Sequence, residues 1–482
     1  MNKSRKSKVF SLSLAQGVVT ASTVVLSMVF TRVMTKDDYA TYLQTFLAYD
    51  FLKPVLTLGL PMALYNLLPG EVKGKKVVSE VMLLLFLAGV IFSLFMIFGG
   101  TDLLAKRFNN PNLSQTLKWM TIYPLYTFPI LCVGSVLVVN NRVGINAIYN
   151  IITGVGLAIA VIIAAFIYRG YTYPLIVKIF FPLFIFPFGI YYCFKYTSGK
   201  FDIPELSSLW RILKFSVPLG LATTIASIAV QLSNMIVSIF CSPSDYATFS
   251  TGAREIPFIT VVTGSIATVI MAEMALHIKN GELKRSLELF RRGTTVSSMF
   301  LIPILLFLIL YGDCFIKLMY SEAYADSVIP FRIFLFYLPI RIVQYNTVYI
   351  AFGQSRAILF RSAVHLIITA LCCLFFVCEF GYWGAALGAI TASYLWALPY
   401  NLYKLSSYFK CKKVEVLPIK NLSRVFLWSS LSAIIASPVL IVDTDYVVKL
   451  CLGGFVFILS YFLLMYHFFD DFNIVKSIWK RN

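Results

Sequence analysis

Long apolar segments, separated by short polar stretches, run along the whole chain. Most are about 20 residues or longer, the length at which an α-helix crosses the hydrocarbon core of a bilayer. Inside a bilayer each crossing segment must satisfy its own backbone hydrogen bonds, so these segments are expected to be helices. The pattern predicts about fourteen spanning helices, at roughly 9–33, 40–67, 77–98, 117–139, 144–168, 173–194, 216–240, 247–276, 295–312, 328–351, 362–379, 383–402, 425–442 and 447–468.

A short phrase near the start of the second segment recurs in the second half of the chain. Residues 38–42 (Asp-Tyr-Ala-Thr-Tyr) return as residues 245–249 (Asp-Tyr-Ala-Thr-Phe). Each copy closes one apolar segment and opens the next, and the same alignment pairs Leu12 with Leu219 and Met28 with Met235. The chain therefore reads as two copies of one multi-span unit. Such repeats are typical of membrane transporters that bind their substrate between two halves.

The longest polar stretches fit this duplication. One lies at 195–214, where the repeat predicts the boundary between halves, and another at 404–424 separates twelve segments from a final pair. We therefore expect an all-α polytopic membrane protein with two pseudo-symmetric six-helix bundles and a C-terminal helix pair. The expected divisions are an N-terminal lobe at 1–205, a C-terminal lobe at 206–412, and two additional helices with a tail at 413–482.

Composition and charge agree with a membrane protein. Hydrophobic residues make up 59% of the chain and charged residues 13%, too few charges for the surface of a soluble protein of this length. The net charge of +19 could suit nucleic acid. However, most of the 41 Lys and Arg residues gather at the N-terminus and in alternate loops, including 71–76, 195–214, 278–292, Arg356 with Arg361, and 404–424. This positive-inside pattern predicts cytoplasmic termini, and anionic lipid rather than nucleic acid explains the basic loops.

Several familiar signatures are absent or incomplete. The basic N-terminus resembles a signal peptide, but the apolar run is long and lacks a small-residue cleavage pattern, so we expect a retained first span. Nine scattered cysteines without a Cys-x-x-Cys favour packing roles over a metal site or disulfide frame. Residues 70–76 only mimic a phosphate-binding loop, with three rather than four residues between the glycines. We expect no metal, no cofactor and no enzymatic activity.

Polar side chains form a stripe along the first span and along its repeat partner, the seventh. Their spacings of three and four residues place each set on one helical face. Such stripes either join helices through small hydroxyl residues or line a hydrated cavity between the lobes. The members are Ser13, Gln16, Thr20, Thr23, Ser27 and Thr31, and Thr223, Ser227, Gln231, Asn234 and Ser238. The cavity-lining positions that we expect are Gln16, Thr20, Ser27, Thr223, Ser227, Gln231 and Asn234.

Charged residues within the spans need a partner or water, because one at the bilayer centre costs about 2.5–3.5 kcal/mol on insertion scales. Asp50 and Lys53, three residues apart, either neutralise each other or take part in transport. Arg254 and Glu255 are adjacent and point about 100° apart on a helix, so they cannot mainly satisfy each other. Arg254 is expected to share a face with Ser250 and Thr251.

A similar set lies on the tenth span. Arg341 is expected to share a helical face with Tyr337, Gln344 and Tyr345, and Gln344 and Tyr345 are further expected cavity positions. Arg254 and Arg341 each make either a structural ion pair or an anion-binding contact, since a guanidinium suits a bidentate grip on phosphate.

Other acidic residues are open to more than one interpretation. Glu273 and His277 lie four residues apart near the inner end of the eighth span. They form a proton relay, a boundary ion pair or a solvated cap. Asp50, Glu255 and Glu273 are the positions that we consider for ion coupling. Asp38 and Asp245, inside the repeated phrase, are expected to be helix N-caps.

The order of these features resembles bacterial polysaccharide transporters of the multidrug/oligosaccharidyl-lipid/polysaccharide (MOP) exporter superfamily. A basic N-terminus, an apolar span, the Asp-Tyr-Ala of 38–40 and a second span ending Gly-Leu-Pro-Met-Ala-Leu-Tyr at 59–65 resemble the start of these proteins. The resemblance covers nearly the whole chain, and further similar segments are 215–221, 244–247, 252–255, 320–325 and 351–356.

This resemblance implies a fold, a substrate and a location. Such proteins have two six-helix bundles around a central cavity and use alternating access to flip undecaprenyl-pyrophosphate-linked oligosaccharide repeat units across the bacterial inner membrane. By resemblance, Arg254, Arg341 and Lys53 would contact the pyrophosphate. Transport would be coupled to a proton or sodium gradient or to the membrane potential. The partners implied are membrane lipids and other polysaccharide-assembly proteins.

Three rival functions remain open at this stage. A multidrug or cation antiporter of the same superfamily would want a deep carboxylate without a neighbouring cation, whereas Asp50 has Lys53 beside it. Many relatives also carry an acidic residue after the position of Asn234 and a Gly-Tyr where Asp245-Tyr246 stands, and this departure weakens a cation site on the seventh span. A lipid II-type flippase shares the expected fold. A polysaccharide polymerase is disfavoured, because the expected outer loops are short.

Overall fold

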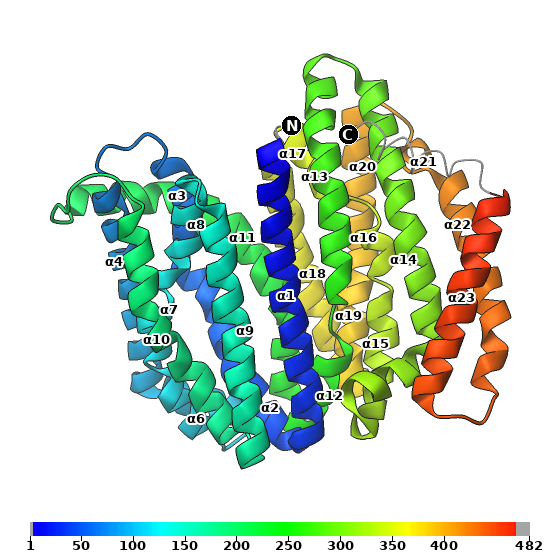
Figure 1. Ribbon diagram of the computed structural model, residues 1–482, viewed down its shortest axis with the longest axis horizontal. Helices are drawn as coiled ribbons and strands as arrows, with labels where there is room; N and C mark the ends of the chain where they lie inside the picture. Colours follow the sequence, from blue (N-terminus) through cyan, green and yellow to red (C-terminus); the bar gives the residue numbers. More distant parts are fainter. Residues whose placement is uncertain (1–2, 469–482) are drawn as a thin grey trace. The chain divides into compact units, whose positions relative to one another are not determined.

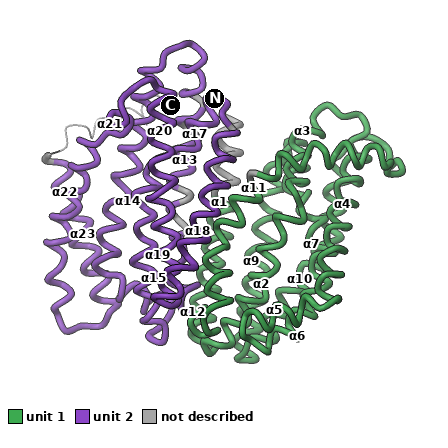
Figure 2. The backbone as a smooth tube through the Cα atoms, turned by 180° about the vertical axis from the view of Figure 1, so that it is seen from behind, with its two compact units in different colours: residues 1–247 green, residues 248–482 purple. Residues whose placement is uncertain are grey.

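The computed structural model describes residues 3–468, and every regular element in that range is a helix (Figure 1). Packing divides the chain into two compact units at Ala247/Thr248 (Figure 2), and the short helix α12 (Pro243–Gly252) crosses this boundary. Unit 1 contains α1 (Lys3–Val33), α2 (Lys36–Thr57), α3 (Leu60–Leu67), α4 (Gly74–Phe95), η1 (Met96–Gly100), α5 (Thr101–Arg107), α6 (Leu113–Met120), α7 (Tyr123–Thr127), η2 (Pro129–Leu131), α8 (Cys132–Val139), α9 (Val143–Tyr168), α10 (Thr172–Lys195) and α11 (Leu206–Phe240).

Unit 2 is equally helical. It contains α13 (Pro257–Lys279), α14 (Leu283–Tyr320), η3 (Glu322–Ser327), α15 (Val328–Leu335), α16 (Leu338–Arg341), α17 (Tyr345–Ala351), α18 (Ser355–Phe380), η4 (Gly381–Trp383), α19 (Gly384–Ala392), η5 (Ser393–Ala397), α20 (Leu398–Phe409), α21 (Lys413–Val416), α22 (Ile419–Ala436), η6 (Ser437–Leu440) and α23 (Tyr446–Phe468). The predicted all-α class is confirmed. The division at 205/206 and 412/413 describes the sequence repeat, not the packing, and stays a prediction.

The helices suit a membrane, although their number differs from a simple count of apolar segments. Ten described helical stretches are long and apolar enough to span a bilayer, or eleven if the pair Leu113–Thr127 and Pro129–Val139, bent by 46°, forms one span. One of these stretches, Arg356–Phe409, contains α18 and α19, which pack against each other. Other predicted spans are broken into pieces too short to be counted singly. The figure of fourteen therefore stays a prediction.

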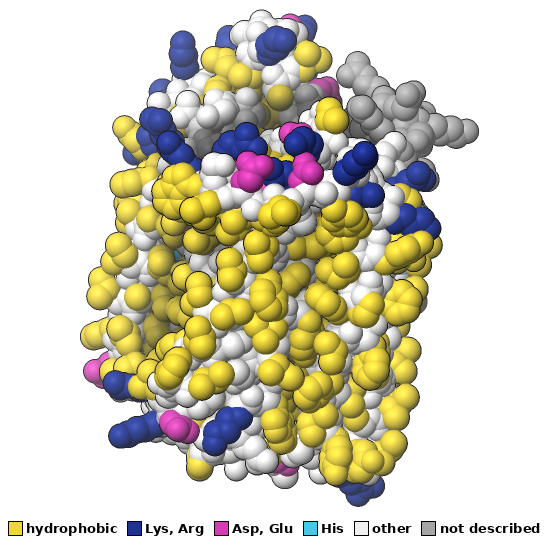
Figure 3. Space-filling view, turned by 90° about the vertical axis from the view of Figure 1, so that its left-hand side faces the viewer, with side chains coloured by type: hydrophobic (Ala, Val, Ile, Leu, Met, Phe, Trp, Pro, Cys, Tyr) yellow, Lys and Arg dark blue, Asp and Glu magenta, His cyan; other side chains and the backbone are white. Residues whose placement is uncertain are grey.

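The face drawn in Figure 3 has the polarity that a bilayer requires. On the face drawn in Figure 3, apolar side chains cover the middle of the molecule, and Lys, Arg, Asp and Glu side chains gather toward its two ends. Ile163, Phe184 and Phe188, from α9 and α10, are large apolar side chains left exposed. Contiguous apolar surface on this scale marks contact with lipid.

The repeated phrase has a conserved local geometry between its two copies, but its aspartates do not cap the helices, so that prediction was wrong. The Thr35 hydroxyl accepts the backbone N–H of Asp38 at 3.1 Å, and the Ser242 hydroxyl accepts the N–H of Asp245 at 3.1 Å. The Asp245 carboxylate in turn accepts the Ser242 N–H. The capping group is thus the hydroxyl three residues earlier, and the aspartate lies in the first turn.

A break in the second predicted span positions α11 within unit 1. Leu58 and Gly59, between α2 and α3, both have left-handed backbone angles, with φ of 40° and 71°. Gly59 lies against Gly220 of α11, where a Cβ on Gly220 would come within 2.2 Å of the Leu58 carbonyl carbon. One turn along α11, the Thr224 hydroxyl donates to the Pro54 carbonyl at 2.9 Å. These backbone-level contacts explain why α11 packs with unit 1.

The C-terminal helix pair is attached to unit 2 through one aromatic core. Tyr311 of α14, Ala436 of α22 and Phe457 of α23 form a buried cluster. The Tyr311 hydroxyl donates to the Ala436 carbonyl at 2.7 Å. Gly453 allows this approach, since a Cβ there would overlap the Tyr311 ring. The pair α22–α23 therefore docks on α14 as part of unit 2.

Candidate functional site

The eighth predicted span is broken at its charged residues. Between α12 and α13 the segment 253–256 is not helical, because Pro257 has no N–H for a helical bond and pushes Ile256 to an extended conformation (φ −68°, ψ 118°). Arg254 and Glu255 lie in this segment with exposed side chains. The predicted helical face shared by Arg254, Ser250 and Thr251 was therefore wrong.

The tenth predicted span is also broken. It forms α15, α16 and α17, with Pro339 in the first turn of α16 and a non-helical Gln344 (φ −86°, ψ 63°) before α17. The predicted shared face of Tyr337, Arg341, Gln344 and Tyr345 was wrong, because the helix stops at Arg341. Arg341 is exposed, Gln344 is half-buried and donates its side-chain amide to the Arg341 carbonyl, and Tyr345 is buried.

An ion pair joins these two breaks. The Arg341 guanidinium contacts the Glu255 carboxylate through both oxygens, with Nε–Oε1 at 2.9 Å and a second contact to Oε2 at 3.1 Å. Both side chains remain partly exposed, at 49% for Arg341 and 38% for Glu255. This fork-to-fork geometry is the one that a guanidinium also uses for phosphate. Because the pair is accessible, an anion could compete with Glu255 for the same donors.

A second charged cluster lies in unit 1, and sequence reasoning identified only part of it. Asp50 and Lys53 do not form an ion pair with each other. Lys178 of α10 and Lys53 both lie within electrostatic reach of the Asp50 carboxylate. The Lys178 ammonium lies over the rings of Phe46 and Tyr42, at 3.4 and 4.7 Å from their centroids.

Lys53 has a comparable position, 5.5 Å from the centroid of the Tyr49 ring. Asp50 itself is exposed. The cluster thus holds two cations on aromatic faces around one accessible carboxylate, an arrangement with a net positive charge. The aromatic ladder of Tyr42, Phe46 and Tyr49 at helical spacing was the available signal, but nothing in the sequence says that α10 lies beside it.

The polar stripes change character along each helix. In α1, Gln16 and Thr23 are exposed, whereas Ser27 and Thr31 are buried. In α11, Thr223 is exposed, and Ser238 is buried and accepts a hydrogen bond from Gln44 at 2.9 Å. The half-buried members between these ends are Thr20, Ser227, Gln231 and Asn234; Ser13 lies outside the residues whose side chains are described.

Most hydroxyls of the stripes are satisfied within their own helix. Thr20 donates to the Gln16 carbonyl and Ser227 to the Thr223 carbonyl, at 2.7 and 2.8 Å. Asn234 donates to the Gln231 side chain at 3.3 Å. The Ser238–Gln44 bond represents the helix-contact alternative. The exposed members, which lie in the middle of α1 and α11, keep the cavity alternative open.

Glu273 and His277 belong to a cluster at the end of α13. His277 lies 3.8 Å from Glu273 and 2.7 Å from Glu282, and Arg285 contacts Glu282 at 2.9 Å. Hydrogen bonds from His277 and Arg285 hold the pKa of Glu282 below its usual range. The geometry corresponds to a charged boundary cluster between α13 and α14, with Glu282 as the member that the sequence did not point to.

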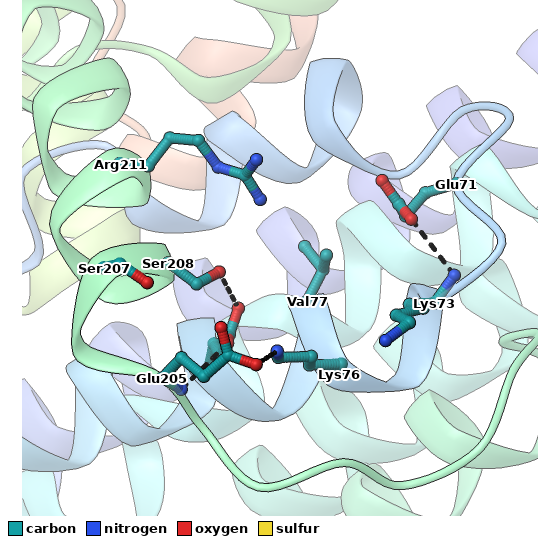
Figure 4. Close-up of a pocket in the computed structure, with 9 residues that line it drawn as sticks. Glu71, Lys73, Lys76, Val77, Glu205, Ser207, Ser208 and Arg211 are labelled. Carbon is teal, nitrogen blue, oxygen red and sulfur yellow. Dashed lines mark hydrogen bonds and ion pairs between the residues drawn. The ribbon is translucent and has the colours of Figure 1, made fainter.

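A cavity of about 290 Å³ lies in unit 1, apart from these charged sites (Figure 4). Its lining residues are Glu71, Lys73, Lys76, Val77, Glu80, Glu205, Ser207, Ser208 and Arg211. Across it, Lys76 of α4 contacts Glu205 at the start of α11, and the fully buried Glu80 accepts the Ser208 hydroxyl at 2.7 Å. Nearby, Lys73 contacts Asp202 at 3.1 Å. We call these contacts between 71–80 and 197–208 the linker clasp, because they tie the α10–α11 connection to α4.

Acid is expected to loosen the linker clasp. The hydrogen bond from Lys76 holds the pKa of Glu205 below the usual 4.5. A carboxylate with a lowered pKa stabilises the fold above its unfolded pKa, and this contribution is lost as pH falls through the folded value. The melting temperature of the purified protein should therefore decrease as the pH is lowered below 4.5. Glu205→Gln should make the melting temperature less dependent on pH in this acid range. Glu71→Gln is the matched control and should keep the pH dependence of the wild type. If Glu205→Gln also kept it, this expectation would be contradicted.

The residues that the structure describes contain no group of three or more His, Cys, Asp or Glu side chains placed to hold a metal ion. The chain matches a family profile described as “Polysaccharide biosynthesis protein” over residues 29–329. No curated protein matches it.

Solved structures share the fold. The chain is similar to a structure described as “Lipid II flippase MurJ, inward closed conformation”, with 17% identity, a TM-score of 0.75, and coverage of 94% of this chain and 98% of that one. It is also similar to an inward-facing multidrug resistance MATE family transporter of the MOP superfamily, with 15% identity, a TM-score of 0.64, and coverage of 81% and 96%. A MOP superfamily transporter from Pyrococcus furiosus, with 14% identity, a TM-score of 0.60 and coverage of 84% and 97%, is a third. At these identities the likeness concerns the fold, not the substrate.

Proposed function

The chain belongs to the polysaccharide biosynthesis protein family, and from this premise we propose that it is a flippase for lipid-linked oligosaccharides. Its substrate is an undecaprenyl-pyrophosphate-linked repeat unit, which it moves across the bacterial inner membrane by alternating access. The product serves the assembly of a surface polysaccharide, such as an O-antigen, capsule or exopolysaccharide. Both chain termini lie in the cytoplasm in this proposal.

The accessible ion pair between Arg341 and Glu255 carries the proposal. Non-helical backbone at membrane depth is tolerated where it lines a water-filled cavity or is buried in protein, and transporters use broken helices for substrate sites. Here the two breaks in unit 2 are joined by one guanidinium and one carboxylate. Like the carboxylate of Glu255, each phosphate of a pyrophosphate offers two oxygens on one atom to a guanidinium, and pyrophosphate carries more charge, so it can displace the carboxylate from Arg341. Arg254 and Lys53 are the further proposed pyrophosphate contacts.

The polar stripes are proposed to face the sugar. A hydrophilic oligosaccharide needs hydroxyl and amide groups along its path. Gln16 and Thr223 offer them at exposed positions, and Thr20 and Ser227 at half-buried ones. Asp50, Glu255 and Glu273 are the proposed sites for coupling to a proton or sodium gradient. In this proposal, substrate binding at Arg341 releases Glu255 from the ion pair, which ties the state of Glu255 to the state of the substrate site.

Two rivals share the fold. A multidrug or cation antiporter is favoured by the MATE neighbours. However, Asp50 has Lys178 and Lys53 beside it, and Glu255 has Arg341 beside it, so neither carboxylate is without a neighbouring cation. A lipid II-type flippase is favoured by the MurJ neighbour, and its substrate carries the same pyrophosphate. A polymerase or other enzyme has no observation in its support.

Deletion of the coding gene in its host separates these functions. The proposal expects loss of surface polysaccharide and accumulation of lipid-linked repeat units in the inner leaflet, both reversed by the wild-type gene. Accumulation of lipid II with cell lysis would point to the peptidoglycan precursor instead. Intact surface polysaccharide with increased sensitivity to cationic drugs would point to the antiporter.

A further inference from the structure

Arg361 lies inside unit 2, although its sequence position suggested an inner loop. Helix α18 begins at Ser355, so Arg361 is almost two turns into it and half-buried. Its guanidinium donates to Asn401 Oδ1 of α20 at 3.1 Å and to Asn346 Oδ1 of α17 at 3.0 Å. The ring of Tyr349 lies 5.7 Å away. Three helices therefore meet at one cation.

Within residues 3–468, no carboxylate contacts Arg361. Its partners are two neutral amides, and the groups that act on it electrostatically are the tyrosines Tyr349, Tyr400 and Tyr345. Two arginines of the broken tenth span are matched by acids: Arg332 contacts Asp313 at 2.5 Å, and Arg341 contacts Glu255. A cation withdrawn from water without a counter-charge is costly, so the contrast calls for a ligand that supplies the charge.

The same place has an excess of hydrogen-bond donors. A guanidinium has five N–H groups, and two of those of Arg361 are used. Asn401 Oδ1 is already shared with the Tyr349 hydroxyl at 2.9 Å. The hydroxyl of Tyr345, a residue only 5% exposed, has no hydrogen-bond partner among the described residues. Asn346 is exposed and gives access from outside. Unused donors around an unmatched cation are the chemistry of an oxyanion site.

A line of polar groups leads from this site toward the ion pair at the helix breaks. His365, one turn beyond Arg361, lies 3.1 Å from the Ser393 hydroxyl, which in turn lies 3.5 Å from the Tyr337 hydroxyl. Tyr337 is within electrostatic reach of Arg341 and Glu255. Polar side chains, linked from His365 to Tyr337, therefore lie between the helix of Arg361 and the ion pair of Arg341 with Glu255.

We propose that Arg361, with Asn346, Asn401 and Tyr345, forms a binding site for the phosphate group of a lipid. Two lipids supply this chemistry: the pyrophosphate of the polyprenyl carrier and the phosphodiester of an anionic phospholipid. The first source rests on the proposed function and would make Arg361 an additional contact on the substrate's path. The second does not depend on it.

The test measures lipid binding to the purified full-length protein in detergent by native mass spectrometry. The probes are a polyprenyl pyrophosphate and phosphatidylglycerol. Loss of a charge-assisted contact of about 1.5–3 kcal/mol predicts that Arg361→Gln weakens binding of one probe by about 10- to 150-fold. Arg356→Gln, an exposed arginine at the start of the same helix, is the matched control and should stay within about twofold of the wild type.

Tyr345→Phe is a second test of the site, for the case that Arg361→Gln fails to fold. Removing an unpaired buried hydroxyl should not lower the melting temperature, but it should weaken binding of the same probe by about 2- to 12-fold, the value of one neutral hydrogen bond. A preference for polyprenyl pyrophosphate or for phosphatidylglycerol identifies the source, and either supports the site. The proposal would be overturned if folded Arg361→Gln bound both probes as strongly as the wild type does. If Arg361→Gln does not fold, the same result for Tyr345→Phe would overturn it. If only the phospholipid binds, the site stands and the proposed function is untouched.

Discussion

Replacing Arg341 by alanine is expected to lower transport of lipid-linked oligosaccharide by about 10- to 150-fold, because it removes the charge-assisted bonds that the guanidinium offers to pyrophosphate. The protein should still insert at normal levels, since its partner Glu255 is 38% exposed and can be solvated when left alone. Export of surface polysaccharide by cells that carry the variant, measured beside the amount of protein in the membrane, provides the test.

Two further variants separate recognition from structure. Exchanging the charges, with Arg341→Glu and Glu255→Arg in one chain, restores the ion pair but moves the guanidinium to the other break. We expect this double variant to remain inactive, whereas a purely structural pair would regain wild-type export. Arg332→Ala is the matched control: it breaks a similar arginine–carboxylate contact, with Asp313, away from the two breaks, and export should persist.

Gly220→Ala is expected to have the largest effect on stability. Its Cβ would lie 2.2 Å from the Leu58 carbonyl carbon and 2.5 Å from the Gly59 nitrogen, both of them backbone atoms that cannot swing aside. Overpacking of this kind costs about 1–3 kcal/mol or more. The same collision would separate α11 from the α2–α3 break, so transport should fall together with stability.

The melting temperature of the purified variant checks this expectation. Gly17→Ala is the matched control in α1: nothing lies within 4 Å of its added Cβ, and alanine favours a helix over glycine. That variant should melt at or above the temperature of the wild type. If Gly220→Ala melted like the wild type, the close packing of α11 on α2 and α3 would be contradicted.

Features that depend on local or periodic patterns could be predicted from the sequence. Apolar segments gave the all-α membrane class, and the repeated phrase at Asp38 and Asp245 marked equivalent helix starts, although the capping groups are Thr35 and Ser242. Treating the spans as straight helices caused the main errors. Pro257 and Pro339 were visible in the sequence and are sufficient to break the helices next to Glu255 and Arg341.

Contacts between distant segments could not be predicted. Glu255 and Arg341 are 86 residues apart, and nothing in a single sequence pairs them. Nothing in the sequence places Lys178 of α10 over the ring of Phe46 of α2. Arg361 appeared to belong to a loop because hydropathy sets a helix boundary at the first charge, whereas amide partners on α17 and α20 let α18 begin at Ser355. The tertiary neighbours, not local propensity, decided these positions.

Reconstitution of the purified protein in liposomes tests the flippase account most directly. Undecaprenyl-pyrophosphate-linked oligosaccharide is placed in both leaflets, and a membrane-impermeant enzyme that cleaves the glycan is added outside. The account predicts that wild-type protein exposes the inner pool to cleavage, while Arg341→Ala and protein-free liposomes leave it protected. The result that would contradict it is an inner pool that stays uncleaved in liposomes with folded wild-type protein, even under imposed proton and sodium gradients and a membrane potential.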